Sequence, residues 1–88
     1  MPTKIQYSKD ALKYLSKLDK KTVNRIREAI NGLVGVPPIG DIKPMQGYPV
    51  GVMRLRVGKW RVIYRKSSDG VYEIILVMNI GARGDIYK

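Results

Sequence analysis

Arginines alternate with apolar residues along two neighbouring segments of this sequence, residues 53–57 and 60–65. The Gly58-Lys59 pair between them is typical of a two-residue turn, so we expect the two segments to form a β-hairpin. Residues directly opposite each other in a hairpin lie on the same face of the sheet. One face is therefore predicted to be mostly cationic, and it carries Arg54, Arg56, Arg61, Ile63 and Arg65.

This predicted cationic face is suited to binding an anion. Arg56 would lie opposite Arg61, with Arg54 next to Arg56 on the same strand. Like charges placed opposite each other destabilise a sheet, so three guanidinium groups on one patch need a compensating partner. A phosphate group fits, because a guanidinium can donate two parallel hydrogen bonds to its oxygens. The alternative is an ordinary solvated outer face, and the pattern leaves both interpretations open. A bulge within the hairpin would invalidate this assignment of faces.

Two further candidates lie near the C-terminus. Arg83 follows an apolar segment, within Gly81-Ala82-Arg83-Gly84, and Tyr87 is the penultimate residue. Arg83 is either a second cation for the same anion or a turn residue with a free charge. Tyr87 is either a phenol that takes part in chemistry or a hydrophobic anchor for the end of the chain. The residues in isolation do not decide between these alternatives.

Several lysines, and two aromatic residues besides Tyr87, are weaker candidates for contacts with RNA. Lys59 lies in the predicted turn, beside the cationic face. Lys13 and Lys17 belong to a series with a spacing of four, so they would lie on one face of a helix. That helix face either contacts structured RNA or is simply solvated, which is the interpretation we favour. Trp60 is expected in the core rather than stacked on a base, whereas Tyr48, in a loop, is left open between these two roles.

The composition is strongly basic. The chain has 88 residues, with 17 Lys and Arg against 7 Asp and Glu, which gives a net charge of +10. A small domain this basic usually binds a polyanion, and nucleic acid is the main candidate. The alternatives are an acidic protein partner, or a charge that only keeps the protein soluble.

Two residue types are missing altogether. The sequence contains neither Cys nor His. This excludes a thiol nucleophile, a disulfide, and histidine as acid, base or metal ligand. No segment resembles a signal peptide or a membrane span, so we expect a cytoplasmic protein that forms one domain over residues 1–88.

The first part of the chain is expected to form one strand and two helices. Residues 3–7 read as a short strand, and Ser8 is expected to cap a first helix that ends near residues 18–20. Thr22 is expected to cap a second helix, whose apolar residues recur at helical spacing. The Pro37-Pro38 pair cannot continue a helix. Together these segments predict a helical hairpin.

The rest of the chain is expected to consist of strands. After the hairpin described above, residues 71–80 are apolar almost throughout and are expected at the centre of a sheet. The Gly- and Pro-rich segment 35–51 is predicted to be a loop, and its length indicates a function. The predicted fold is α+β with the order β-α-α-β-β-β. It consists of an antiparallel sheet with the helical hairpin packed on one face, which leaves the other face for function.

The sequence resembles the RelE/ParE toxin superfamily, and RelE-like mRNA interferases in particular. The resemblance is strongest from residue 43 onward, in the runs R-L-R-V-G-K-W-R-V-I-Y (54–64) and I-G-A-R-G-D-I-Y (80–87), and it extends over the whole chain. It implies the toxin of a type II toxin-antitoxin system, a ribosome-dependent endoribonuclease that inhibits translation. It also implies an activity without metal or other cofactor, and a cognate antitoxin that binds the toxin in a hetero-oligomer.

The resemblance also implies roles for individual residues. Arg61, Arg83 and Tyr87 match functional positions of RelE-like toxins, and Arg54 matches one of two basic positions on the preceding strand. In the implied mechanism the 2′-hydroxyl of the mRNA attacks the adjacent phosphate. We expect the arginines to stabilise the developing charge and Tyr87 to accept the proton. Ala82 stands where many relatives have histidine, which leaves the general acid unidentified.

Two other functions stay open at the level of sequence. One is a ParE-like toxin of the same fold that inhibits DNA gyrase by binding it, without nuclease chemistry. The other is a non-catalytic RNA-binding module, which would explain the arginines but would give Tyr87 no role. The arginine and tyrosine positions favour the nuclease over both.

Overall fold

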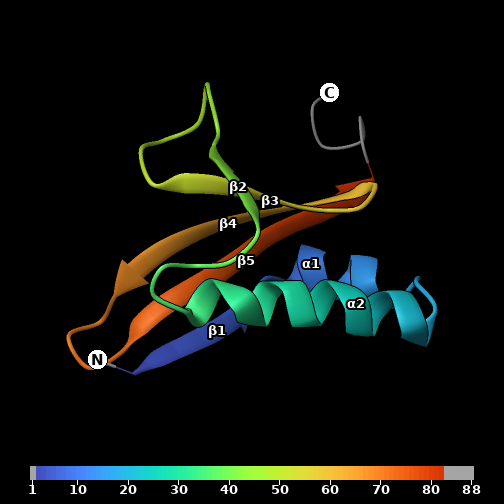
Figure 1. Cartoon of the computed structure of the whole chain (residues 1–88), viewed down its shortest axis with the longest axis horizontal. Coiled ribbons are helices and arrows are strands. Elements are labelled where there is room, and N and C mark those ends of the chain that lie inside the picture. Colours follow the sequence, from blue (N-terminus) through green and yellow to red (C-terminus); the bar gives the residue numbers. More distant parts are fainter. Residues whose placement is uncertain (1, 83–88) are drawn as a thin grey trace.

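The computed structural model of the protein describes residues 2–82, which form two α-helices and one five-stranded sheet. Within the sheet the strands lie in the order β1-β5-β4-β3-β2 (Figure 1). In chain order the elements are β1 (Thr3–Tyr7), α1 (Lys9–Leu15), α2 (Lys20–Asn31), the 3₁₀ turn η1 (Gly32–Val34), β2 (Asp41–Pro44), β3 (Val52–Val57), β4 (Trp60–Ser68) and β5 (Glu73–Ala82).

The predicted α+β fold, with helices on one face of a sheet, is confirmed, but the sheet differs from the prediction in two ways. It is mixed, because β1 pairs with β5 in parallel while the other neighbouring strands are antiparallel. It also contains one additional strand, β2, inside the segment 35–51 that was predicted to be a loop. The apolar strand β5 lies next to the centre, and β4 occupies the centre itself.

The helix starts are held by side-chain caps. Ser8 has extended backbone geometry, and its hydroxyl accepts a hydrogen bond from the Ala11 amide at 3.0 Å, which confirms the predicted cap. The predicted cap at Thr22 is wrong. Asp19 caps α2, because its carboxylate accepts hydrogen bonds from the Thr22 hydroxyl and, at 3.2 Å, from the Thr22 amide. These hydrogen bonds favour the charged carboxylate and lower the pKa of Asp19.

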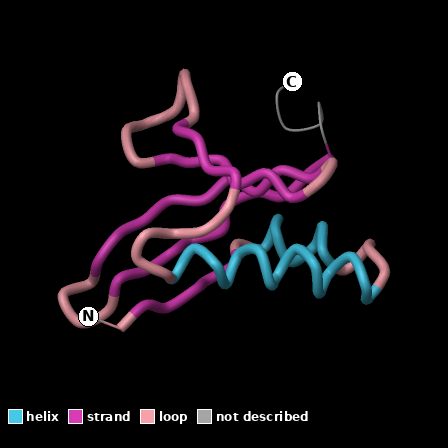
Figure 2. Tube along the Cα trace, viewed as in Figure 1, coloured by secondary structure: helices cyan, strands magenta, loops and turns pink. Residues whose placement is uncertain are grey.

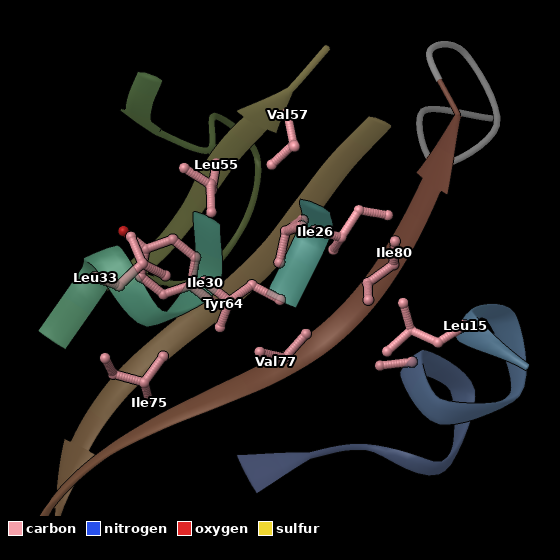
Figure 3. Close-up of a cluster of buried hydrophobic side chains, with 12 residues drawn as sticks. Leu15, Ile26, Ile30, Leu33, Leu55, Val57, Tyr64, Ile75, Val77 and Ile80 are labelled. Atoms are coloured by element: carbon pink, nitrogen blue, oxygen red, sulfur yellow. The ribbon is translucent and has the colours of Figure 1, made fainter. Parts of the chain in front are cut away.

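The main core lies between the helices and one face of the sheet (Figure 2). Figure 3 shows buried side chains of both helices and of β3, β4 and β5 pointing toward one another. Trp60 packs against this cluster while staying partly exposed, in agreement with its predicted core position. Among residues 2–82, no helix has the length and apolar composition needed to cross a membrane. Both helices pack on the same face of the sheet, and the opposite face carries the candidate arginines of β3 and β4.

Candidate nucleic-acid interface

The β3–β4 hairpin forms with the predicted register. Val57 pairs with Trp60 across the turn, Arg56 with Arg61, and Arg54 with Ile63. Gly58 has a positive φ of 60°, the backbone conformation that a tight hairpin turn requires. The register shift in this region lies between β4 and β5, so it leaves the faces of the hairpin as predicted.

Four arginines therefore share the sheet face that points away from the helices. We call this surface the arginine face and define it as Arg54, Arg56, Arg61 and Arg65. Arg56 and Arg61 form an opposed pair of like charges near the β3–β4 turn, and both are half-buried. Arg65 is exposed and lies opposite Val52, at the far end of the β3–β4 pairing from the turn. Because directly opposed guanidinium groups repel each other, an anion bound between Arg56 and Arg61 would reduce this repulsion.

The strand that sequence reasoning missed changes the environment of Arg54. In the β2–β3 pairing Asp41 lies opposite Arg56, and Lys43 lies opposite Arg54. The Asp41 carboxylate accepts a hydrogen bond from Arg54 Nη2 at 3.3 Å. The Arg54 side chain is only 9% exposed, against 50% for Asp41. Arg54 is thus already paired with a carboxylate and largely withdrawn from solvent.

The arginine face is not polar throughout. Met45, which follows β2, packs on Val52 and Ile63 in a second buried cluster, with Met78 beside it. Since Val52 lies opposite Arg65, this apolar cover sits at the Arg65 end of the face. Arg56 and Arg61 lie at the other end, beside Gly81 of β5, which pairs with Arg61 and presents no side chain. Among residues 2–82, this apolar cluster therefore does not reach the end of the face next to the β3–β4 turn.

The structure does not bring the predicted lysines together. Lys59 lies in the β3–β4 turn, and its ammonium group is 4.9 Å from the centre of the Trp60 ring. Lys13 is exposed on α1, which packs on the opposite side of the sheet from the arginine face. Lys17 is exposed beyond the end of α1, so the predicted series of lysines does not continue along one helix. Of these three, only Lys59 lies at the edge of the arginine face.

Two candidate residues lie outside the described part of the chain. Arg83 and Tyr87 belong to residues 83–88, which the structure does not describe. The last described residue, Ala82, pairs with Trp60 and follows Gly81, the partner of Arg61. Within residues 2–82 no three acidic side chains come together in a way that could hold a metal ion.

A comparison with known protein families shows which family this chain belongs to. Residues 5–87 match the family described as the ParE toxin of type II toxin-antitoxin system, parDE. The chain belongs to this family. It is therefore a type II toxin of the RelE/ParE superfamily, as the resemblance in its sequence implies. Among curated protein sequences no match was found.

Solved structures of such toxins share the fold. A chain of the archaeal RelE–RelB complex from Pyrococcus horikoshii OT3 superposes with a TM-score of 0.73 at 26% identity, covering 97% of this toxin and 99% of that chain. The YoeB/ParE toxin from Agrobacterium tumefaciens gives a TM-score of 0.73 at 20% identity, covering 91% and 98%. The toxin-antitoxin complex RelBE2 from Mycobacterium tuberculosis gives 0.71 at 22% identity, covering 94% and 100%. The RelE-like architecture is thus shared over nearly the whole chain.

Proposed function

We propose that this toxin is a ribosome-dependent endoribonuclease that cleaves mRNA and so inhibits translation. The observation that carries the proposal is the Arg56–Arg61 pair, two opposed guanidinium groups on the sheet face that the helices leave uncovered. A surface of this kind fits a phosphodiester better than it fits a neutral or cationic ligand. The net charge of +10 supplies the long-range attraction that brings RNA to it.

The reaction assigned to this face is an internal phosphoryl transfer. The 2′-oxygen of a ribose forms a bond to the adjacent phosphorus, the bond from phosphorus to the 5′-oxygen breaks, and a proton moves from the first oxygen while another reaches the second. The products are a cyclic phosphate and a free 5′-hydroxyl. Negative charge grows on the phosphate oxygens, and Arg61 with Arg56 stabilises it. Arg83, which follows β5 in the sequence, is proposed as a third cation for the same phosphate.

A base is needed to accept the proton of the 2′-hydroxyl. Two tyrosines of the described part of the chain are unsuitable for this role. Tyr64 is buried on the core face, and this burial raises the pKa of its phenol, so it can neither reach RNA nor ionise readily. Tyr72 lies beyond the far end of β4. Tyr87 is the proposed base because it is the position that the family resemblance indicates.

We also propose an antitoxin as the partner of this toxin in the cell. The related chains from Pyrococcus horikoshii OT3 and Mycobacterium tuberculosis were solved in complexes with antitoxins. A protein that neutralises the arginine face would have to offer carboxylates to Arg56, Arg61 and Arg65, in the way Asp41 already does for Arg54. Such a partner blocks the surface that we assign to RNA.

Primer extension on mRNA from cells that express the toxin tests the nuclease proposal. We expect cuts within translated regions, in phase with codons, and no cuts in the same mRNA when its translation is prevented by removal of the start codon. The family description as a ParE toxin favours gyrase inhibition as the second candidate function. Intact mRNA together with a supercoiling defect would establish that second function and refute the first.

Arg65 provides a test of how RNA lies on the face. Because Arg65 is exposed, Arg65→Ala should remove one phosphate contact without disturbing the core. The slope of log Kd against log salt should fall by about 0.7, the value for one phosphate of a single strand. Fluorescence anisotropy with a labelled oligoribonucleotide measures this slope. Lys13→Ala, on the helix side, is the control, and a larger change with Lys13→Ala would place RNA on the helices instead.

A further inference from the structure

The segment between β2 and β3 forms a raised arm beside the arginine face. We define the β2–β3 arm as residues 45–51, and Figures 1 and 2 show it on the side of the sheet away from the helices. The arm is fixed at its base, because the Met45 amide donates to the Val52 carbonyl at 3.1 Å and Met45 is buried against Ile63. The Val52 amide in turn donates to the Pro49 carbonyl at 3.2 Å. The arm is thus a folded feature rather than a loose connection.

The arm displays an aromatic ring. Tyr48 is 41% exposed, although a large aromatic side chain is usually more deeply buried. Gly47 and Gly51, on either side, have positive φ values of 79° and 97°, which let the chain turn tightly around this ring. The second cluster, which anchors the arm, consists of Met45, Val52, Ile63 and Met78 and does not include Tyr48. The sequence left Tyr48 open between packing and stacking, and these observations favour an outward role.

The position of the arm relative to the arginines indicates what the ring would meet. Val52, the first residue after the arm, lies opposite Arg65, and Arg56 follows four residues later on the same strand. At roughly 3.3 Å per residue, the Val52 backbone is therefore about 13 Å from the Arg56 backbone. The face carries cations toward both ends, Arg56 and Arg61 near the turn and Arg65 beside the arm, with the buried Ile63 between Arg61 and Arg65 on β4. Proteins that bind single-stranded nucleic acid combine cations that contact the backbone with aromatic rings on which bases stack.

We infer that Tyr48 stacks on an unpaired base of the RNA strand, a few nucleotides from the phosphate held by Arg56 and Arg61. This rests on the proposed function and adds to it a second point of attachment that sets where the strand lies. RNA is favoured over a protein partner because Arg65, the exposed residue opposite Val52 at the base of the arm, is a cation. Val50 is an apolar residue of the arm that is fully exposed, at 102%, and it serves as the control for apolar contacts that do not involve stacking.

Equilibrium binding of a labelled single-stranded 2′-O-methyl oligoribonucleotide tests this inference, because the blocked 2′-oxygen prevents cleavage. Tyr48→Ala should weaken binding about tenfold, the size of one base–aromatic stacking contact, while Tyr48→Trp should bind at least as tightly as wild type. Tyr72→Ala is the matched control, since Tyr72 is 38% exposed but lies in the β4–β5 turn, with the Lys4 ammonium 5.3 Å from its ring centre. It should leave the affinity unchanged.

An oligonucleotide of the same length without bases completes the experiment. Wild type and Tyr48→Ala should bind it equally, because no base is left to stack. Equal affinity of these two proteins for the base-containing strand overturns the inference. If Arg61→Ala still weakens binding in that case, the proposed RNA-binding face survives. Val50→Ala should have no effect, and a loss of RNA affinity as large as that of Tyr48→Ala would show that the arm acts through its apolar surface rather than through stacking on Tyr48, which overturns the inference. Codon-phased cleavage by wild type tests the nuclease separately.

Discussion

Replacing Arg61 by alanine should lower the rate of mRNA cleavage by about 10²–10³-fold and abolish growth arrest, the typical effect of removing one donor that stabilises a developing oxyanion. Arg61 is half-buried and lies opposite Arg56, so its guanidinium is held where the phosphate is expected. Much of its interaction with the substrate should develop in the transition state, because the phosphate oxygens gain charge there. The cleavage rate should therefore fall by more than the affinity for RNA.

Two variants separate this role from a general effect of charge. Arg27→Ala removes the same charge from α2, where the guanidinium lies 5.4 Å from the Tyr7 ring centre, and it should leave cleavage unchanged. Arg61→Lys keeps the charge at the site but loses the planar fork, so it should restore cleavage only in part. Circular dichroism and the melting temperature check that each variant folds. A folded Arg61→Ala protein that cleaves mRNA at the wild-type rate would remove Arg61 from the mechanism.

The β3–β4 hairpin could be predicted from the sequence in detail. A two-residue turn at Gly58-Lys59 permits one register, and that register decides which arginines share a face. The first helix cap could be predicted for a similar reason, because Ser8 and the amide it accepts from are only three residues apart. In both cases the interactions that determine the structure are local, so the sequence pattern contains them.

The parts that the sequence did not predict depend on contacts between distant segments. β2 is four residues long and includes Pro44, a residue that is rare in strands, so its local pattern indicated a loop. It becomes a strand because it pairs with the edge of β3, and only that pairing brings Asp41 to Arg54. The parallel pairing of β1 with β5 joins residues about 70 positions apart, from Thr3 with Glu73 to Tyr7 with Val77, and no local signal encodes it.

The same distinction applies to the candidate site. The alternation of arginines predicted which face is cationic, but it could not reveal that Met45 covers one end of that face or that Arg54 is paired. Both facts shift the expected phosphate position toward Arg56 and Arg61. They also show that a count of arginines in the sequence does not reveal which of them is paired, as Arg54 is with a carboxylate from a neighbouring strand.

Replacing Tyr87 by phenylalanine should lower cleavage by about 10²–10⁴-fold, the usual contribution of a general base, while binding to the ribosome stays close to wild type. The change removes one oxygen atom and keeps the ring, so an anchor role for the side chain would survive it. The rate of the wild-type protein should rise with pH as the phenol ionises, and this rise should be absent from Tyr87→Phe. Single-turnover cleavage across a pH series, with ribosomes programmed by a defined mRNA, measures both quantities.

Tyr72→Phe is the matched control for that measurement, because Tyr72 is an exposed phenol in the β4–β5 turn, and it should behave as wild type at every pH. A Tyr87→Phe protein with the wild-type rate and pH profile would contradict the base role. The arginines would then act on the phosphate alone, and the ribosome or the RNA itself would have to accept the proton. A strong loss of rate with an unchanged pH profile would instead assign Tyr87 to positioning, because only a base links its own ionisation to the reaction.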